Sequence, residues 1–235
     1  MWTKFISMGC LDLLFPPVCP VCNASVKGEQ SGALCNDCMM GVRLIEEPLC
    51  SICGMQIYAR STRNHICGDC LTKRPPFDCA RSLFRYDEEI RILISKLKYK
   101  KDTSVIKALA SLMRGCDLQL FDTCDYVIPV PLHRKRVQQR GFNQALLLAK
   151  ACFGYNDSRI LLTTLQRTVN TVPQVSLDAK RRRNSLKNVF KVSPHVNISG
   201  RAICLIDDVY TTGNTVSECS RALLSGGAAT VLVLT

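Results

Sequence analysis

The chain has 235 residues, 47% of them hydrophobic, and its 31 lysines and arginines outnumber 19 acidic residues, for a formal net charge of +12. No run of apolar residues approaches the roughly 20 that a membrane-spanning helix requires, so the sequence predicts no membrane span. The excess of positive charge favours a polyanionic partner. The length is sufficient for a small module followed by one α/β domain.

The N-terminal segment, residues 2–15, carries enough large apolar side chains to predict a short helix seated on the module that follows. Membrane attachment is the alternative, but Asp12 and the lack of a basic cluster disfavour it. The segment also lacks the pattern of a secretory signal. This favours a reduced, cytoplasmic setting for the cysteines downstream.

Four C-x-x-C pairs come next, separated by twelve, eleven and thirteen residues. Each pair makes a tight turn that aims two sulfurs at one ion, and two such turns close a zinc ribbon. Pairing neighbours gives two sites, with a crossed arrangement left open by the spacing: Cys19, Cys22, Cys35 and Cys38, then Cys50, Cys53, Cys67 and Cys70. Because four sulfur ligands leave no position for water, we expect structural zinc and a docking role for this module.

Disulfides are the alternative use of these cysteines, but C-x-x-C turns in a reduced compartment favour metal or redox chemistry. A thioredoxin-like redox site would need one such pair beside a βαβ unit. The other seven cysteines are unclustered and are interpreted as small hydrophobic residues.

After the cysteine pairs, the pattern alternates between strands and helices. Residues 80–86 are strand-like, and 87–99 and 105–113 predict two helices that form a hood or flank. Residues 126–130 predict the first core strand. A basic loop, a helix at 143–152, a strand at 160–165 and a polar, mobile loop at 167–188 are expected to follow.

The last elements complete the predicted sheet. Residues 202–206 form an apolar run typical of a parallel strand buried on both faces, followed by a helix at 215–224 and a strand at 229–234. The sequence therefore predicts an N-terminal helix and double zinc-ribbon domain at residues 1–74. Residues 75–235 are predicted to form an α/β domain with a doubly wound, mostly parallel sheet.

Polar residues begin where the 202–206 strand should end, at the sheet edge where open α/β sheets bind ligands. Asp207 and Asp208 can accept hydrogen bonds from two vicinal hydroxyls, and one of them could touch a divalent ion through water. Hydroxyl and backbone N–H groups suited to a phosphate follow at a helix start, in Thr211, Thr212, Gly213, Asn214 and Thr215. The alternative interpretation is a solvated Asp pair with Thr215 as an ordinary N-cap.

The order of apolar strand, Asp-Asp-x-x-Thr-Thr-Gly-x-Thr and helix resembles the phosphoribosyl-pyrophosphate (PRPP) signature of type I phosphoribosyltransferases. The resemblance implies a type I phosphoribosyltransferase-like fold, PRPP or phosphate as a ligand, and Mg²⁺ as a cofactor together with PRPP. It also implies that the loop after the first core strand holds the pyrophosphate, with Pro131, Leu132, His133 and Arg134 as candidates. The 167–188 loop would close over the substrate.

A larger resemblance spans nearly the whole chain. A double zinc ribbon ahead of Pro129-Val-Pro-Leu-His133, Arg140-Gly-Phe-Asn-Gln144 and the Asp207–Thr215 motif is similar to the ComF family, with its ComFC and GntX-type members. The resemblance implies a cytoplasmic protein of natural transformation that handles incoming single-stranded DNA. A ComFA-like ATPase would be its partner, through the zinc domain. GntX-type relatives are linked instead to nutrient use of DNA or to gluconate uptake.

Three basic clusters mark the expected anion surface: residues 96–101, residues 133–136 with Arg140, and residues 180–183. Aromatic residues near them are few, so we expect single-stranded DNA to be bound mostly through its backbone. The candidate contacts are Lys98, Lys100, Lys101, Arg134, Lys135, Arg136, Arg140, Asn143, Lys180, Arg181, Arg182 and Arg183. Two four-thiolate zinc sites would lower the net charge only to about +8.

Two functions of different classes are compatible with these motifs. The first is DNA handling, in which the PRPP-type pocket binds phosphate or nucleotide without chemistry. The alternative is an active, Mg²⁺-dependent phosphoribosyltransferase that uses PRPP with an unknown acceptor, although no acceptor motif is recognisable. A third option is an interaction protein with a vestigial pocket, in which Asp207→Ala and Asp208→Ala change no activity.

The 180–183 cluster gives a direct test of the DNA surface. Replacing Arg181, Arg182 and Arg183 by alanine is expected to weaken single-stranded DNA binding and to flatten its salt dependence, because fewer counterions are released from the phosphates. Fluorescence anisotropy of a labelled strand at two salt concentrations measures both effects. An unchanged slope would move the DNA surface elsewhere on the molecule.

Overall fold

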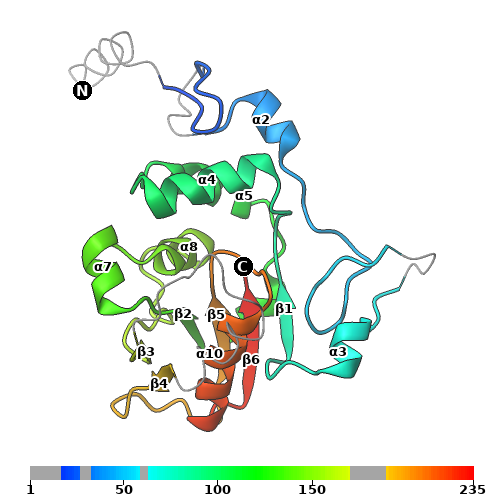
Figure 1. Ribbon diagram of the computed structural model, residues 1–235, viewed down its shortest axis with the longest axis vertical. Helices are drawn as coiled ribbons and strands as arrows, with labels where there is room; N and C mark the ends of the chain where they lie inside the picture. The colour runs from blue at the N-terminus through cyan, green and yellow to red at the C-terminus, as the bar shows by residue number, and fades with distance from the viewer. Residues whose placement is uncertain (1–16, 27–32, 59–62, 170–188) are drawn as a thin grey trace, which may run out of the picture.

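A computed structural model describes residues 17–26, 33–58, 63–169 and 189–235, so that the helix predicted at residues 2–15 and the Lys180–Arg183 cluster lie outside the described residues. The helices are α2 (Asn36–Gly41), α3 (Gly68–Thr72), α4 (Glu88–Tyr99), α5 (Val105–Met113), α6 (Gln119–Asp122), α7 (Arg134–Arg140), α8 (Gln144–Phe153) and α10 (Asn214–Ser225). The strands are β1 (Cys79–Arg81), β2 (Tyr126–Pro129), β3 (Leu165–Arg167), β4 (Phe190–Val192), β5 (Ala202–Ile206) and β6 (Thr230–Leu234). Figure 1 shows their arrangement.

The centre of the fold is a four-stranded sheet with the order β1-β6-β5-β2, in which every neighbouring pair is parallel. β5 lies between β6 and β2, with Ile203 opposite Val231 on one side and Tyr126 on the other. A central parallel strand is covered on both faces, which explains the unbroken apolar run predicted to be a strand. The α/β class with a mostly parallel sheet is confirmed.

The two faces of β5 belong to two separate hydrophobic cores. Cys204 and Ile206 face the core that contains α4, α5 and α8, whereas Ile203 and Leu205 face the core that contains α10. Burying each large aliphatic side chain in such a core contributes roughly 1.5–3 kcal/mol. The sheet is therefore wound on both faces, and α4 and α5 form a further layer beyond α8 (Figure 1).

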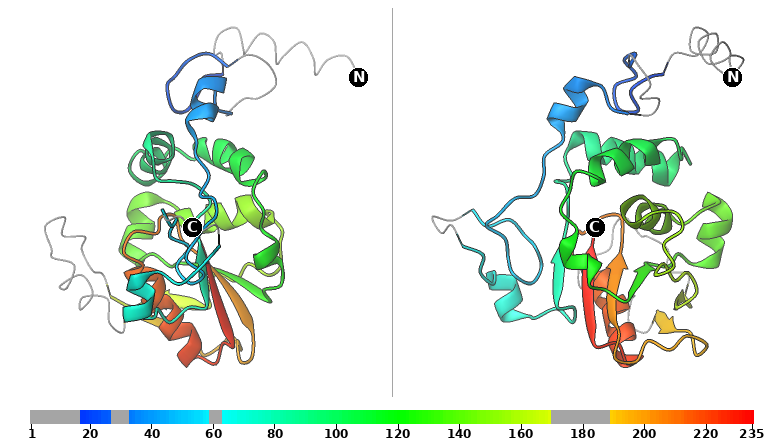
Figure 2. Two further views of the ribbon diagram at one scale, coloured as in Figure 1. Left: turned by 90° about the vertical axis from the view of Figure 1, so that its right-hand side faces the viewer. Right: turned by 180° about the vertical axis from the view of Figure 1, so that it is seen from behind.

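The cysteine pairs form two small modules that pack in different places. The first zinc ribbon, residues 17–26 and 33–42, lies above α4 and α5 in every view (Figures 1 and 2), and Lys96 of α4 donates a hydrogen bond to the Pro20 carbonyl at 2.6 Å. The second zinc ribbon, residues 48–58 and 63–75, lies beside β1. There the Ala80 N–H donates to the Ile52 carbonyl at 2.6 Å, and buried Cys50, Ile52 and Phe77 share the α10 core.

Two expected strands are shorter than the sequence suggested. The strand expected at residues 80–86 ends at Arg81, and Phe84 makes only an isolated bridge to Leu44. The strand expected at 160–165 was wrong as one element: Ile160 makes a single parallel bridge to Val127 before the chain leaves the sheet. Ser193 then donates to the Thr164 carbonyl, which starts a separate antiparallel ribbon of β3 and β4.

The basic segment after β2 was expected to be a loop and is instead α7. His133 caps this helix by accepting a hydrogen bond from the Lys135 N–H through its ring nitrogen at 3.3 Å. Gly141, with φ of 89°, ends it in the left-handed conformation that favours glycine. Among the described residues, no helix is both long and apolar enough to cross a bilayer.

A substitution at Gly54 tests the close contact between the second zinc ribbon and β1. The φ of Gly54 is +71°, and a Cβ placed there would lie 2.4 Å from the Ala80 carbonyl oxygen. Gly54→Ala is expected to lower the free energy of unfolding by at least about 1–3 kcal/mol, the cost of a strained backbone position. Urea unfolding of the zinc-loaded protein measures this loss.

Gly68→Ala is the matched control, because a Cβ at Gly68 meets no atom within 4 Å. This variant is expected to unfold within about 0.5 kcal/mol of the wild type, as surface substitutions usually do. Equal effects of the two substitutions would contradict a close contact between Gly54 and β1.

Candidate functional site

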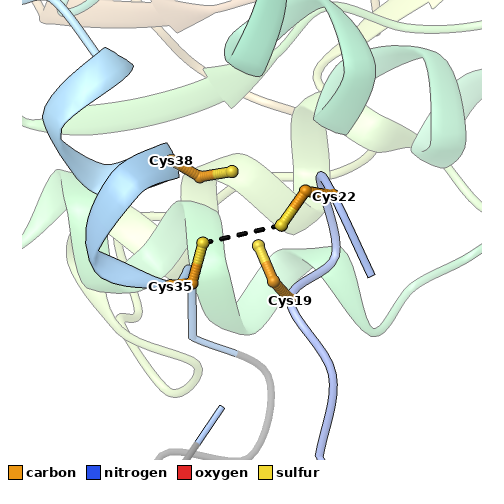
Figure 3. Close-up of side chains that lie close together, drawn as sticks. All are labelled: Cys19, Cys22, Cys35 and Cys38. Atoms are coloured by element: carbon orange, nitrogen blue, oxygen red, sulfur yellow. Dashed lines mark hydrogen bonds between the residues drawn. The ribbon is translucent and has the colours of Figure 1, made fainter. Parts of the chain in front are cut away.

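The first cysteine cluster has the geometry of a metal centre. Cys19 and Cys22 come from a turn, Cys35 caps α2, and Cys38 lies within α2, so that the four sulfurs face one point (Figure 3). All ligand atoms lie within 4.8 Å of one another, and the Cys22 and Cys35 sulfurs are 3.6 Å apart. A tetrahedral zinc ion with Zn–S bonds of ~2.3 Å separates its sulfurs by ~3.8 Å, so the cluster fits zinc.

The second cluster repeats this design in a more buried setting. Cys50 and Cys53 come from a turn, while Cys67 caps α3 and Cys70 lies within it. The Cys53 and Cys67 sulfurs are 3.7 Å apart, again close to a tetrahedral edge. The structure thus brings neighbouring C-x-x-C pairs together, rather than the crossed pairs that spacing left open. The two four-cysteine clusters indicate two zinc sites.

One cysteine in each cluster is prepared as a thiolate by the backbone. Burial would raise the pKa of Cys50, but N–H groups of Cys67, Cys53 and Ile52 lower it to about 6. Cys19 is similar: burial would raise its pKa, but the N–H groups of Cys22, Cys35 and Val21 lower it to about 6. Because zinc binds thiolates, these bonds favour metal binding at neutral pH. Four sulfur ligands give the metal a structural role.

The acidic pair stands at the carboxyl end of β5. The Asp208 N–H donates to the Asp207 Oδ1 at 2.9 Å, and burial together with the neighbouring Asp208 charge raises the pKa of Asp207 well above its usual value. Asp208 forms a short ion pair with Lys98, which reaches down from α4. Lys98, expected to be a DNA contact, is therefore directed at the acidic pair.

The turn after the acidic pair ends in a helix start that no side chain caps. Gly213 is the N-cap of α10, with φ of 66°, and α10 begins at Asn214. Thr215 therefore lies inside the helix, and its interpretation as the N-cap is wrong. A Cβ at Gly213 would lie 2.4 Å from the Tyr210 hydroxyl, so glycine is required on steric grounds as well. Thr211 and Thr212 are exposed beside this turn.

The loop after β2 lies directly alongside the acidic pair. The Val130 N–H donates to the Ile206 carbonyl at 2.8 Å, so that Pro131, Leu132 and His133 leave the sheet next to Asp207. Asn143 holds this loop in place, because its side-chain amide donates to the Val130 carbonyl at 3.0 Å. Its Oδ1 also accepts from the Ala145 N–H and caps α8.

The Arg140-Gly-Phe-Asn-Gln144 signature is thereby explained as a support for the loop. Arg140 donates to the Gln144 side chain across the start of α8, while Asn143 binds both the loop and the helix. Asn143, expected to be a DNA contact, has both of its polar groups occupied within the fold. Arg134 and Lys135 are exposed on α7, as are Lys100 and Lys101 after α4.

Arg167 ends β3 of the separate antiparallel ribbon and was not singled out in the sequence. Burial lowers the pKa of this guanidinium, as does the charge of Arg136, while Asp207 acts in the opposite direction. The charges of Arg136 on α7 and of Asp207 therefore both act on Arg167. Its position two residues after a predicted strand was an available signal, but it was assigned to the 167–188 loop.

Taken together, carboxylates, N–H groups, hydroxyls and arginines meet at the carboxyl edge of the sheet. Carboxylates suit sugar hydroxyls, whereas the uncapped helix start and the arginines suit phosphate oxygens.

A family described as a double zinc ribbon domain matches residues 10–71. The chain is 34% identical over 230 residues to the DNA utilization protein YhgH of Escherichia coli O157:H7, which covers 94% of this chain and 96% of that protein. It is 32% identical over 226 residues to Competence protein F of Haemophilus influenzae, covering 92% and 94% of the two chains. Competence protein ComFC of Bacillus subtilis is 28% identical over 203 residues, covering 83% and 80%.

The two clusters predict different consequences of losing one ligand. Elemental analysis should give about two zinc ions per chain, and both Cys22→Ser and Cys50→Ser should reduce this to about one. Cys22 is exposed, whereas Cys50 is fully buried in a core shared with the sheet. Cys50→Ser should therefore lower the thermal unfolding midpoint more than Cys22→Ser. One zinc or none in the wild type would contradict the paired sites.

Proposed function

The chain belongs to the ComF family, and we propose that it binds single-stranded DNA through a basic surface of its α/β part, in competence or DNA utilization. The relatives carry these two processes in their names, which supports the biological setting. Cytoplasmic location is part of the proposal, on the reduced state expected for the zinc-binding cysteines.

One observation carries the proposal: two basic clusters that are distant in sequence lie side by side. The C-terminal end of α4 lies next to α7 (Figures 1 and 2), and the charges of Arg140 and Tyr99 both act on the pKa of Arg136, which burial lowers. Lys100 and Lys101 follow Tyr99 there, and Arg134 and Lys135 are exposed on α7. We call these residues, 99–101 and 134–136, the α4–α7 surface.

The α4–α7 surface has the two features required to bind single-stranded DNA of any base sequence. Its lysines and arginines suit a phosphate backbone, and Tyr99, 79% exposed, offers a ring on which a base can stack. Between this surface and the acidic pair the link is electrostatic, because the charges of Arg136 and Asp207 both act on Arg167. A DNA strand bound on the α4–α7 surface could therefore continue toward the turn at residues 211–213. The Lys180–Arg183 cluster stays a predicted extension of the surface, outside the described residues.

The alternative, an active phosphoribosyltransferase, is supported by the arrangement at the end of β5. In that reaction the bond from ribose C1 to pyrophosphate breaks, its electrons leave with the pyrophosphate, and an acceptor attacks C1. Asp207 and Asp208 would hold the ribose hydroxyls, the turn the 5′-phosphate, and the loop after β2 the pyrophosphate. Mg²⁺, when bound, would neutralise the leaving pyrophosphate, and carboxylate oxygens are suitable partners for it.

Partner binding is proposed for the first zinc ribbon. Val18, Met39 and Met40 are exposed there, and exposed apolar side chains suit a protein partner such as a ComFA-like ATPase. The domain boundary at residue 74 stays a prediction, because the second zinc ribbon shares a core with the following sheet.

The α4–α7 surface can be tested by removing two exposed charges. Arg134→Gln combined with Lys135→Gln should weaken single-stranded DNA binding and reduce the magnitude of the salt slope by about 1.4, or about 0.7 per lost phosphate contact. Arg114→Gln combined with Arg201→Gln removes the same charge elsewhere and should leave the slope unchanged. Fluorescence anisotropy of a labelled oligonucleotide at several salt concentrations measures both proteins.

Tyr99→Ala separates stacking from charge. It should weaken binding by about 1–3 kcal/mol, the usual loss for one stacked base, with no change in salt slope. Displacement of the bound DNA by PRPP and Mg²⁺ would extend the DNA path to Asp207.

Equal salt slopes for the wild type and the Arg134→Gln, Lys135→Gln variant would contradict the proposal, as would an absence of DNA binding at low salt. Turnover with any acceptor would favour the alternative.

A further inference from the structure

Within the described part of the chain, β4 pairs with β3 alone, and its other edge has no strand beside it. The Ser193 N–H and the Val189 carbonyl bond to the β3 side of this ribbon, at 2.7 and 2.8 Å. Because hydrogen bonding alternates along an antiparallel strand, the N–H and C=O groups of Phe190 and Val192 point away from β3. The outer edge of β4 therefore presents donors and acceptors for one further strand.

A cavity of about 500 Å³ lies between β4 and α10, which are neighbours in the fold (Figure 1). All three residues of β4 line one side. The other side is one face of α10, made by residues three and four apart: Glu218, Arg221, Ala222 and Ser225. At one end the elements are in close contact, because a Cβ at Gly226 would lie 2.9 Å from the Val192 side chain. We call this cavity the β4–α10 groove.

The two sides of the β4–α10 groove match in length. The three residues of β4 span about 10 Å, at roughly 3.4 Å per residue. From Glu218 to Ser225, α10 covers about the same distance at roughly 1.5 Å per residue. A free strand edge facing a helix across such a groove is the arrangement in which an extended peptide binds by strand addition. The groove has room for about three residues of such a peptide.

The alternation of side chains along β4 decides which peptide residues meet which surface. Phe190 is buried and Val192 half-buried, whereas Lys191 between them is exposed on the opposite face. Residues directly opposite each other on neighbouring strands point to the same face. A peptide residue opposite Lys191 would therefore point outward. The residues before and after it would point to the buried face, toward α10, where the small Ala222 leaves room for apolar side chains.

The charge of the groove favours an acidic peptide residue at the outward position. Arg221 is paired with Glu218 on α10, so these two charges balance each other. Lys191 forms no salt bridge with any described residue. Its ammonium group is thus the uncompensated charge of the groove, and a carboxylate directly opposite it is favourable. The matching peptide has the pattern apolar, acidic, apolar.

We propose that the β4–α10 groove binds an extended segment of a partner protein as a third strand next to β4, with an acidic residue opposite Lys191 and an apolar residue on each side of it. A second copy of this chain suits the groove less well. Pairing two β4 edges about their central residues would place Lys191 opposite Lys191, and like charges in that position are unfavourable. The groove includes neither the acidic pair nor the α4–α7 surface, so the proposal is independent of DNA binding.

A reversal of charge tests the contact at Lys191. The probes are two fluorescein-labelled peptides with blocked ends, Gly-Val-Glu-Val-Gly and Gly-Val-Lys-Val-Gly, titrated with the full-length, zinc-loaded protein by fluorescence anisotropy. The wild type should bind the glutamate peptide at least fivefold more tightly than the lysine peptide, and Lys191→Glu should reverse this preference. A misfolded variant would not gain affinity for the lysine peptide, so the reversal is specific to the contact.

Two further comparisons test strand addition and the position of the peptide. An added strand bonds to β4 through alternate residues. Methylating the backbone nitrogens of both valines, or instead that of the glutamate, should abolish binding in one case and change it less than twofold in the other. Ser225→Trp, at an exposed residue that lines the groove, should weaken binding of the glutamate peptide at least tenfold. Ser158→Trp, exposed and outside the groove, is the matched control and should change it less than twofold.

Several results would overturn the inference. The wild type would bind neither peptide, Lys191→Glu would leave the preference unchanged, both methylated peptides would bind like the parent, or the two tryptophan variants would behave alike. Light scattering provides one more: a dimer of the wild type that Ser225→Trp dissociates would assign the groove to a second copy of the chain. Single-stranded DNA binding should be the same in the wild type and Ser225→Trp, which separates this inference from the proposed function.

Discussion

The hydrogen bond from the Val130 N–H to the Ile206 carbonyl, at 2.8 Å, is the constraint on which the carboxyl edge of the sheet depends. It extends the pairing of β2 with β5 one residue beyond the strands, so the loop after β2 and the acidic pair emerge together. Asn143 then holds the Val130 carbonyl from the other side. A family signature more than sixty residues from the acidic pair thus acts on it through one residue of the loop, Val130.

The two zinc ribbons have similar sequences of ligands but different relations to the fold. The first contacts α4 through one lysine bond and a few apolar side chains, and its methionines face solvent. The second is bound edge to edge with β1 and contributes buried cysteines to the α10 core. A short segment with few large apolar residues needs metal to fold, but once folded it can also form one side of a cavity, as the second zinc ribbon does beside the turn after β5. Similar ligand spacing therefore does not imply the same function.

The sequence was most informative where one local interaction decides the structure. The apolar run of β5, the stripe of α4 and the C-x-x-C turns each predicted an element that the structure contains. Prediction failed where a tertiary contact decides. Leu161 donates to the Val127 carbonyl and then the chain turns away, which no periodicity in residues 160–165 reveals. The α7 helix was missed for another reason: its cap is local, but His133 was first interpreted only as a ligand.

The candidate site shows the same division. The acidic pair and the turn could be predicted because they are contiguous, whereas Arg167, Lys98 and the second zinc ribbon reach the site from separate elements. Charge counting alone treated Lys98 as one more surface cation, although its partner is Asp208. No spacing rule connects residues 98 and 208.

The Lys98–Asp208 ion pair also limits how the acidic pair can behave. Asp207 is buried beside Asp208, and both burial and that neighbouring charge raise its pKa. Without Lys98, two carboxylates would share a site with no nearby ammonium, and the ionised form of both would become still less favourable. Lys96 and Lys98 lie two residues apart on α4, one bonded to Pro20 of the first zinc ribbon and the other to Asp208. One helix therefore carries both the support of the first zinc ribbon and the counter-charge of the acidic pair, so the position of α4 fixes the two together.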